Sequence, residues 1–383
     1  MQHNGKNYDT MVRMALHSPH SSDRLALIAG ARQAVLFGKN MPHAQRPGVA
    51  DWVTQSWLRC LSQGMQPART LGFDIVSTAM QKRHAEANQR LVSAAQPTIA
   101  QLGEAIAQTR YFAIVTNRDG VVVSAAGAID KTDSRAQLIS RVGANLSESA
   151  VGTTAIGATL AQQHTTWLHR GEHFFDDTQC YSCAGAPIIG PQGECVGMLD
   201  VTGIDVPERP ELAHLVASSA RSIENALVLA TPHVLVLHLY WPGQHGGKDT
   251  EGLMCLDADG VVRALNPVAR RMLGLDEQPN TALHAEHVFA CDWTQFFDAQ
   301  SRSSAWVVPL WSGLQVCVRS SLAGRLAPKS GVRNLSASLA QPLKEHETAL
   351  IRQTVQDKLG NVAAAAKALG ISRATVYRKL ANR

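Results

Sequence analysis

Apolar residues in the middle of the chain alternate between a helical period and short strand-like runs. The predicted elements follow one another as a helix over 91–108, strands at 111–117 and 121–125, a helix near 152–162, strands near 183–190 and 195–202, and a closing helix over 211–230. The sequence RDG at 118–120 provides a turn between the first two strands, and Leu212, Val216 and Leu227 share one face of the closing helix. This order predicts a central antiparallel sheet with helices at its edges.

A second, shorter pattern of strands covers residues 253–319. It begins with a strand, an Asp-Gly turn at 259–260, another strand, and a short helix that Asn-Pro at 266–267 starts. Two later strands follow, at 305–310 and 314–319. This segment resembles the opening of a PAS domain, although a hairpin followed by a helix also occurs in other α+β folds. We therefore expect a PAS-like domain over 231–320.

The regions that flank these two patterns differ in composition. Residues 1–90 are predicted to be helical, with amphipathic pieces at 22–37 and 49–63. The second piece contains SWLRC (56–60), whose Trp and Leu are expected to pack this helix onto the next domain. Residues 321–342 are rich in Ser, Gly, Ala and Pro, which predicts a flexible linker.

The last segment, 343–383, has the pattern of a helix, a tight turn and a second helix. Asn361 is expected to cap the first helix, Gly370 to form the turn, and Ser372 to cap the second helix. Where two such helices cross, only a small side chain such as Ala366 fits. The second helix then exposes donors for phosphates and base edges, which are Ser372, Arg373, Thr375, Tyr377, Arg378 and Lys379.

Positive charge is concentrated in this same segment. It contains eight Lys or Arg and three acidic residues, and this surplus of five equals the net charge of +5 of the whole chain. A basic end on an otherwise neutral chain predicts DNA binding. The segment resembles the C-terminal Fis-type domain of bacterial transcription activators, in which the preceding helix, here 345–358, also serves dimerisation.

Three motifs in the predicted sheet region resemble the GAF domain of acetoin catabolism regulators (AcoR), a family of sigma-54-dependent activators. They are NLSESAVGTTAIG (145–157), EHFF (172–175) and CYSCAGAPIIGPQGECVGMLDVTG (180–203). That family also has a segment like SWLRC ahead of its sensor. The resemblance implies a GAF sensor over 91–230 that binds a small-molecule effector. Leu146, Thr154 and Tyr181 replace the residues usual in that family, so the effector's identity is not carried over.

GAF and PAS pockets are largely apolar with a few convergent polar groups. The residues predicted to form such a pocket lie in or beside the motifs, and they are Thr154, Trp167, His173, Phe175, Tyr181 and Cys183. The alternative is an ordinary core. EHFF is expected to be a strand, in which one of Phe174 and Phe175 points inward and the other outward.

The ATPase module that AcoR-type activators carry between sensor and Fis-type domain is missing. Neither GxxxxGK[ST] nor GAFTGA occurs in the sequence. The nearest string is PGQHGGKD (242–249), in which Pro242 replaces the first glycine and Asp249 the hydroxyl that binds Mg²⁺. We therefore expect no ATP hydrolysis.

The cysteines allow three interpretations. Cys180 and Cys183 form a CxxC, which predicts a redox pair, a zinc site completed by Cys195 and His173, or residues that only line the pocket. A redox pair would make the chain a GAF-type thiol oxidoreductase resembling free methionine sulfoxide reductase, or a redox sensor. An HxxEH string at 169–173 needs a helix to bind metal, and a strand would hold its two histidines too far apart.

Together the patterns predict a multidomain α+β protein, with GAF and PAS-like antiparallel-sheet sensors followed by an all-α Fis-type helix-turn-helix. We expect a ligand-responsive transcription regulator with no catalytic residues, metal or cofactor. Its expected partners are double-stranded DNA, a small-molecule effector, a second copy in a homodimer, and RNA polymerase or a full-length paralogue. The polar N-terminus and the absence of a span-length apolar run predict a cytoplasmic protein without contact with the membrane.

Overall fold

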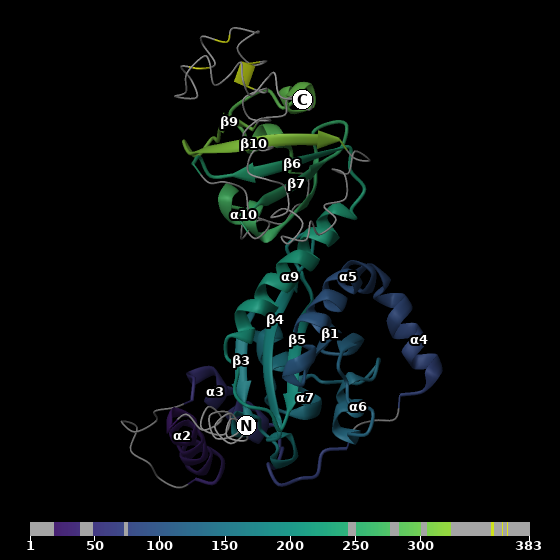
Figure 1. Cartoon of the computed structure of the whole chain (residues 1–383), viewed down its shortest axis with the longest axis vertical. Coiled ribbons are helices and arrows are strands. Elements are labelled where there is room, and N and C mark those ends of the chain that lie inside the picture. Colours follow the sequence, from purple (N-terminus) through teal and green to yellow (C-terminus); the bar gives the residue numbers. More distant parts are fainter. Residues whose placement is uncertain are drawn as a thin grey trace, which may run out of the picture. The chain divides into compact units, whose positions relative to one another are not determined.

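A five-stranded antiparallel sheet forms the middle of the chain in the structure, a computed structural model (Figure 1). Its strands, in the spatial order β2-β1-β5-β4-β3, are β1 (Tyr111–Asn117), β2 (Val122–Gly127), β3 (Thr166–His169), β4 (Tyr181–Ile189) and β5 (Cys195–Ile204). The long β5 lies in the centre and is hydrogen-bonded to β1 on one side and to β4 on the other. The predicted sheet is present, and it includes one strand, β3, that the pattern did not predict.

The structure describes most of the N-terminal two thirds of the chain and little of the C-terminal segment. The described residues are 19–38, 49–72, 76–243, 250–275, 283–299, 305–322, 354–355, 362 and 366. They belong to two units, Met1–Ala323 and Gly324–Arg383. Within these ranges no helix is both long and apolar enough to cross a membrane.

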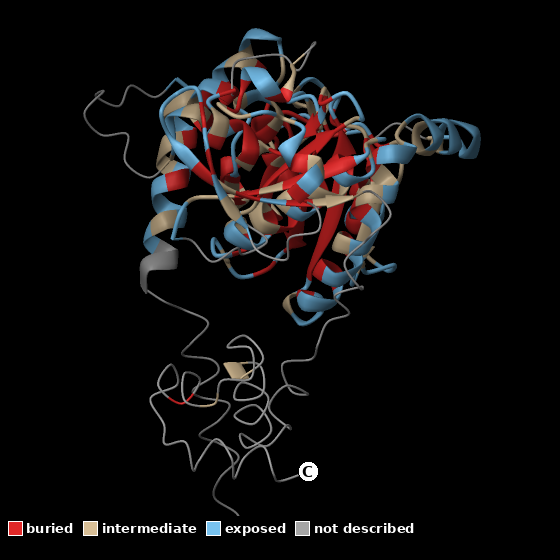
Figure 2. Cartoon of the chain, turned by 90° about the horizontal axis from the view of Figure 1, so that it is seen from above, coloured by how far each residue is buried: buried red, intermediate tan, exposed pale blue. Residues whose placement is uncertain are grey.

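Two long helices, α5 (Gln89–Ala105) and α9 (Leu212–Leu229), pack against each other and cover one face of this sheet. Successive side chains of a strand point to opposite faces, so alternate residues such as Val115 and Leu199 meet Ile99 of α5 in one core. Figure 2 shows buried residues gathered in the sheet and on the helix faces turned toward it. This face is a continuous apolar core.

Short elements cover the opposite face of the sheet. They are the helices α6 (Ser134–Ser140), α7 (Glu148–Val151) and α8 (Ala155–Gln162) and the 3-10 turns η3 (Arg170–Glu172) and η4 (Asp176–Thr178), whereas another 3-10 turn, η2 (Ala107–Thr109), joins α5 to β1. Ile114, Leu168 and Met198 point to this side and form a second core with the short helices. Helix ends and loops therefore come close to the sheet here, and they leave the cavity described below.

Helices from the N-terminal region pack onto the loops of this second side. They are α2 (Pro19–Leu36) and α3 (Asp51–Ser62), whereas α4 (Thr78–Ala87) contacts α5 and β2. Helix α2 contacts α3 and η3, and α3 contacts α8. Trp57 and Cys60 of α3 form a small core with Phe174 and Phe175. The helices expected at 22–37 and 49–63 are thus present, and both belong to the packed sensor region.

A second five-stranded antiparallel sheet follows α9. Its strands, in the order β8-β7-β6-β10-β9, are β6 (Leu235–Tyr240), β7 (Gly252–Leu256), β8 (Val262–Leu265), β9 (Trp306–Pro309) and β10 (Gln315–Leu322). Its short helical elements are α10 (Pro267–Leu273), η5 (Ala285–His287) and α11 (Gln295–Asp298). The sequence pattern did not predict β6, which is the central strand of this sheet and is hydrogen-bonded to β7 and β10. The linker was predicted from 321, whereas β10 continues to Leu322.

Little of the predicted helix-turn-helix lies within the described residues. Thr354, Val355, Val362 and Ala366 are helical, and Ala366 is 3% exposed. The buried Ala366 agrees with a small side chain at a packed position. The predicted DNA contacts lie outside the described residues, and they are Ser372, Arg373, Thr375, Tyr377, Arg378 and Lys379.

Candidate effector site

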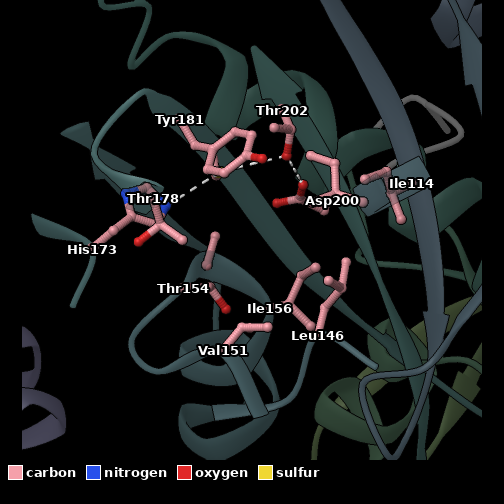
Figure 3. A pocket seen from close by; sticks show the side chains of 13 residues that line it. Ile114, Leu146, Val151, Thr154, Ile156, His173, Thr178, Tyr181, Asp200 and Thr202 are labelled. Carbon is pink, nitrogen blue, oxygen red and sulfur yellow. Dashed lines mark hydrogen bonds between the residues drawn. The ribbon is translucent and has the colours of Figure 1, made fainter. Parts of the chain in front are cut away.

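A small cavity lies between the central strands of the first sheet and the short elements on its second side (Figure 3). Its apolar walls are Ile114, Ile139, Leu146, Val151, Ala155 and Ile156. Its polar groups come from Thr154, His173, Thr178, Tyr181, Cys183, Asp200 and Thr202. An apolar cavity with a few converging polar side chains is the usual form of a small-molecule site.

The space inside the cavity is about 30 Å³. That volume accommodates roughly one or two water molecules. A ligand of several carbon atoms therefore has to push part of the wall outward when it enters. The wall opposite the sheet consists of short helices and turns, whereas the strands are held by ladder hydrogen bonds on both sides. The helix and turn side is therefore the part that can yield.

Asp200 is the charged group of this cavity. It lies on the central strand β5, is fully buried, and pairs with Ile114 of β1 and Gly185 of β4. One carboxylate oxygen, Oδ2, accepts a hydrogen bond from the Thr202 hydroxyl, and the other, Oδ1, has no hydrogen-bond partner among the described residues. Figure 3 shows the carboxylate directed into the cavity beside Thr202.

Burial raises the pKa of Asp200 from 3.8 to about 7, against the lowering effect of the Thr202 hydrogen bond. The folded-state pKa therefore lies above the unfolded-state value. The contribution of this carboxyl to stability is complete below about pH 4 and is lost as the pH rises through about 7. At neutral pH the partly ionised, buried carboxyl of Asp200 therefore lowers the free energy of unfolding.

A chain of contacts connects Asp200 to His173 across the cavity. Thr202 Oγ1 lies 3.4 Å from Cys183 Sγ, which lies 3.5 Å from His173 Nε2. His173 Nδ1 is 3.0 Å from the carbonyl oxygen of Arg170, and because a carbonyl only accepts, Nδ1 carries the proton and Nε2 is left to accept. Burial lowers the pKa of His173 to about 4, so the ring is neutral at pH 7.

The outer surface of the cavity wall is bound to helix α3. Glu148, the first residue of α7, accepts two hydrogen bonds of 2.8 Å from Arg59 and one of 2.6 Å from Ser56. Ser56 also lies 2.7 Å from the hydroxyl of Thr153. Val151 and Thr154 in the same short segment line the cavity. One stretch of chain, 148–156, therefore contacts the cavity on its inner side and the N-terminal helix on its outer side.

The N-terminal helices also hold the loop that carries His173. Trp57 Nε1 donates to the carbonyl of Glu172 at 2.9 Å. Arg32 of α2 donates to the carbonyls of Gly171, His173 and Phe174, and it pairs with Asp176 at 2.8 Å. SWLRC thus supplies side chains that fasten two walls of the cavity. Leu58, expected to pack with Trp57, is instead 52% exposed, because it lies on the outer face of α3.

Comparison with known proteins identifies the sensor region. A family described as MimR, N-terminal domain, matches residues 31–225, more than half of the chain. The chain belongs to the MimR N-terminal domain family. A second family, bacterial regulatory protein of the Fis family, matches residues 342–382 and confirms the predicted Fis-type segment. In this MimR-family chain the matched region contains all the residues that line the cavity, helix α3, and the end of α2 with Arg32.

Named relatives confirm the predicted resemblance to acetoin regulators. The acetoin catabolism regulatory protein of Cupriavidus necator is 27% identical over 227 residues, which are 58% of this chain and 34% of that protein. The signal-transduction and transcriptional-control protein of Clostridium beijerinckii is 26% identical over 232 residues, 59% of this chain and 36% of that protein. The match thus spans about a third of the length of these relatives. The solved E. coli DhaR(N)-DhaL complex aligns at 12% identity and a TM-score of 0.43, covering 70% of this chain and 98% of that one.

Four of the six residues predicted for the effector pocket of this MimR-family chain line the cavity, namely Thr154, His173, Tyr181 and Cys183. Two do not. Trp167 points to the other face of the sheet, where it packs against the core under α5 and α9 and donates to Glu208 at 3.2 Å. Phe175 is buried against α3 with Phe174.

The error over Phe175 comes from the secondary structure of EHFF. Glu172 ends a 3-10 turn and residues 173–175 form bends, so the expected strand is absent. Arg170 has φ of 49°, a left-handed conformation that turns the chain directly after β3. Without strand alternation, both Phe174 and Phe175 point inward and are buried.

Asp200 and Thr202 are the site residues that sequence reasoning missed. Both lie in the predicted strand 195–202, within the run MLDVTG (198–203), where alternate residues face the same side. A charged residue inside an apolar central strand was the available signal, because such a residue is seldom buried without a reason. The positions of β4 and β5 and the turn between them were predicted correctly.

The cysteines lie too far apart for the zinc interpretation. Cys183 pairs with Thr202 and Cys195 with Ile189, so about six strand residues, roughly 20 Å, separate the two thiols. Burial raises the pKa of Cys183 well above its usual value and also raises that of Cys180, so neither resembles a reactive thiolate. Within the described ranges, no group of three or more His, Cys, Asp or Glu is arranged to hold a metal ion.

Proposed function

We propose that this MimR-family chain is a ligand-responsive regulator of transcription, in which a small effector in the cavity changes DNA binding by the Fis-family segment. The observation that carries the proposal is the presence, in one chain, of a cavity with a buried carboxylate and a segment matched by a DNA-binding regulatory family. Transcriptional regulators among the named relatives support the same function.

The route from effector to DNA begins at the wall segment 148–156. An effector that widens the cavity moves this segment, and Glu148 transmits the movement to α3 through Arg59 and Ser56. An effector shifts an equilibrium only by its difference in affinity for the two states. Coupling of about 1–3 kcal/mol, typical of such systems, would change DNA affinity by a factor of roughly 5–150.

The proposed partners are double-stranded DNA, a small-molecule effector and a second copy of the chain. A dimer would present two recognition helices to sites about one helical turn apart. Because no P-loop occurs in the sequence, we propose that the protein acts as a repressor, a conventional activator, or a modulator of a full-length paralogue. We propose no enzyme activity, because the raised pKa values of Cys180 and Cys183 disfavour thiol oxidoreductase chemistry.

Removing Arg59 is expected to uncouple the cavity from α3. Burial raises the pKa of Glu148, but the hydrogen bonds of Arg59 and Ser56 outweigh it and hold the pKa below its usual value. Arg59→Ala leaves this carboxylate half-buried without its main partner, which should cost about 1 kcal/mol of stability after allowance for solvent exposure. DNA affinity should then respond several-fold less to effector, as measured by titration of a selected DNA site with and without effector.

Lys82→Ala is the matched control for this variant. Lys82 also forms an ion pair, with Glu86 at 3.8 Å, but both side chains are exposed on α4. Its removal should leave stability and effector response unchanged. An Arg59→Ala protein that keeps the full effector response would contradict the proposed route.

A further inference from the structure

Asp200 differs from the other buried carboxylates of the sensor in how it is satisfied. Glu172 accepts from Arg24 and from the backbone N–H of His169, and Glu224 accepts from the backbone N–H of Ile189 at 2.9 Å. Among the described residues, Asp200 accepts only from Thr202, two residues further along the same strand, and its Oδ1 has no partner there. A fully buried carboxylate without a second donor is costly to maintain, and structural roles do not require it.

Three of the polar side chains around the cavity use their hydrogens on backbone carbonyls. The hydroxyl of Tyr181 donates to the carbonyl of Arg135 at 3.4 Å, and that of Thr178 donates to the carbonyl of Phe175 at 2.8 Å. The neutral His173 ring uses its one N–H on the carbonyl of Arg170. No described residue donates to Asp200 Oδ1, so a molecule inside the cavity can supply that donor.

The walls decide which kind of donor fits. Six aliphatic side chains form the rest of the lining. A primary ammonium group carries three N–H donors, and the aliphatic part of the wall would leave any donor that reaches neither Asp200 nor an acceptor such as His173 Nε2 unsatisfied. A hydroxyl carries one O–H, which a single free acceptor satisfies. A ketone carries no donor and would place an acceptor against a carboxylate.

We propose that the cavity selects a small uncharged aliphatic alcohol and that Asp200 recognises it by accepting the ligand's hydroxyl hydrogen at Oδ1. This inference rests on the proposed function of the cavity as an effector site. Thr202 positions the carboxylate by donating to Oδ2. The aliphatic walls enclose the carbon skeleton of the ligand, and Asp200 distinguishes an alcohol from the ketone of the same shape.

The test uses three rigid compounds of the same shape, cyclobutanol, cyclobutanone and cyclobutylamine, with the full-length chain. Such small molecules bind weakly, so binding is followed at millimolar concentrations by ligand-observed NMR. At pH 8, where Asp200 is mostly ionised, cyclobutanol should bind at least tenfold more tightly than the ketone or the protonated amine. In Asp200→Asn this preference should fall at least tenfold, because the new amide presents a donor toward the cavity.

Two further readouts separate recognition from a structural role. Asp200→Asn should be at least as heat-stable as the natural chain, and more so at pH 8 than at pH 5, because a costly buried carboxylate is removed. Cyclobutanol binding should weaken as the pH falls from 8 to 5.5. Of the titratable groups facing the cavity, His173 has its pKa lowered to about 4, and the pKa values of Cys183 and Tyr181 are raised, so Asp200 titrates in this range.

Thr116→Val is the matched control. Thr116 on β1 is also buried on the same face of the sheet, its hydroxyl has no hydrogen-bond partner in the described part of the chain, and it does not line the cavity. This variant should keep the full preference for cyclobutanol. The inference would be overturned if the alcohol and the ketone bound equally, or if none of the three compounds bound. It would also be overturned if Asp200→Asn kept the full preference for cyclobutanol. The assay contains no DNA, so its failure is distinct from a failure of effector control of DNA binding.

Discussion

Removal of residues 343–383 is expected to abolish specific DNA binding, a loss of at least a thousandfold in affinity for a selected site. The segment carries the whole net positive charge of the chain and matches the Fis family. The full-length chain should bind with a steep inverse dependence on salt, because Lys and Arg displace counterions from the phosphates. Gel-shift titrations of both proteins over a range of salt concentrations measure the two effects.

Point variants test the same assignment in the intact chain. Arg373→Ala should cost about 1–3 kcal/mol on the selected site and reduce the ratio of specific to non-specific affinity, if its guanidinium pairs with a guanine edge. Lys379→Ala should weaken binding to selected and to random DNA by similar factors and flatten the salt slope by roughly one unit per monomer.

Equal DNA binding by the full-length chain and by the chain without 343–383 would show that the DNA-binding surface lies elsewhere.

Replacement of Trp57 by Ala is expected to destabilise the sensor region by about 3–5 kcal/mol. Trp57 is fully buried, donates to the carbonyl of Glu172 at 2.9 Å, and lies against Phe174 and Phe175. Its loss leaves a cavity and an unsatisfied carbonyl between α3 and the loop that carries His173. Denaturant unfolding followed by circular dichroism measures the change.

Leu58→Ala provides the control, because the neighbouring side chain on the same helix is 52% exposed and should change stability by no more than about 0.5 kcal/mol. Trp57→Phe should give an intermediate loss, since it keeps most of the apolar contact and removes the hydrogen bond. If Trp57→Ala and Leu58→Ala unfolded at the same denaturant concentration, α3 would not be an integral part of the sensor.

The sequence pattern predicted the strands whose apolar runs are long and bounded by turns. The expected strand at 111–117 is β1, and those near 183–190 and 195–202 are β4 and β5. Pocket residues were predicted where a motif surrounded them, as for Thr154 and Cys183. In these cases local periodicity and the tertiary structure favour the same conformation.

Local patterns failed where tertiary contacts set the conformation. The strand β3 has only four residues, which is too short for a clear pattern of alternation. It is followed by Arg170 in a left-handed conformation, which cannot be predicted from a sequence without glycine at that position. The carbonyls of the next loop are held by Arg32 and Trp57, more than a hundred residues away. Asp200 was missed because strand alternation predicts which face of the sheet a side chain lies on. It does not predict that a cavity lies against that face.

The most direct test of the account is hydrogen exchange at the backbone amides of 148–156, measured in the free full-length chain and in the chain saturated with a selected DNA site. Coupling between two sites is reciprocal, so DNA must alter the sensor as the effector alters DNA binding. We predict at least a fivefold change in exchange in this wall segment, and its loss in Arg59→Ala. Identical exchange in 148–156 with and without DNA, while amides of 343–383 become protected, would contradict the account.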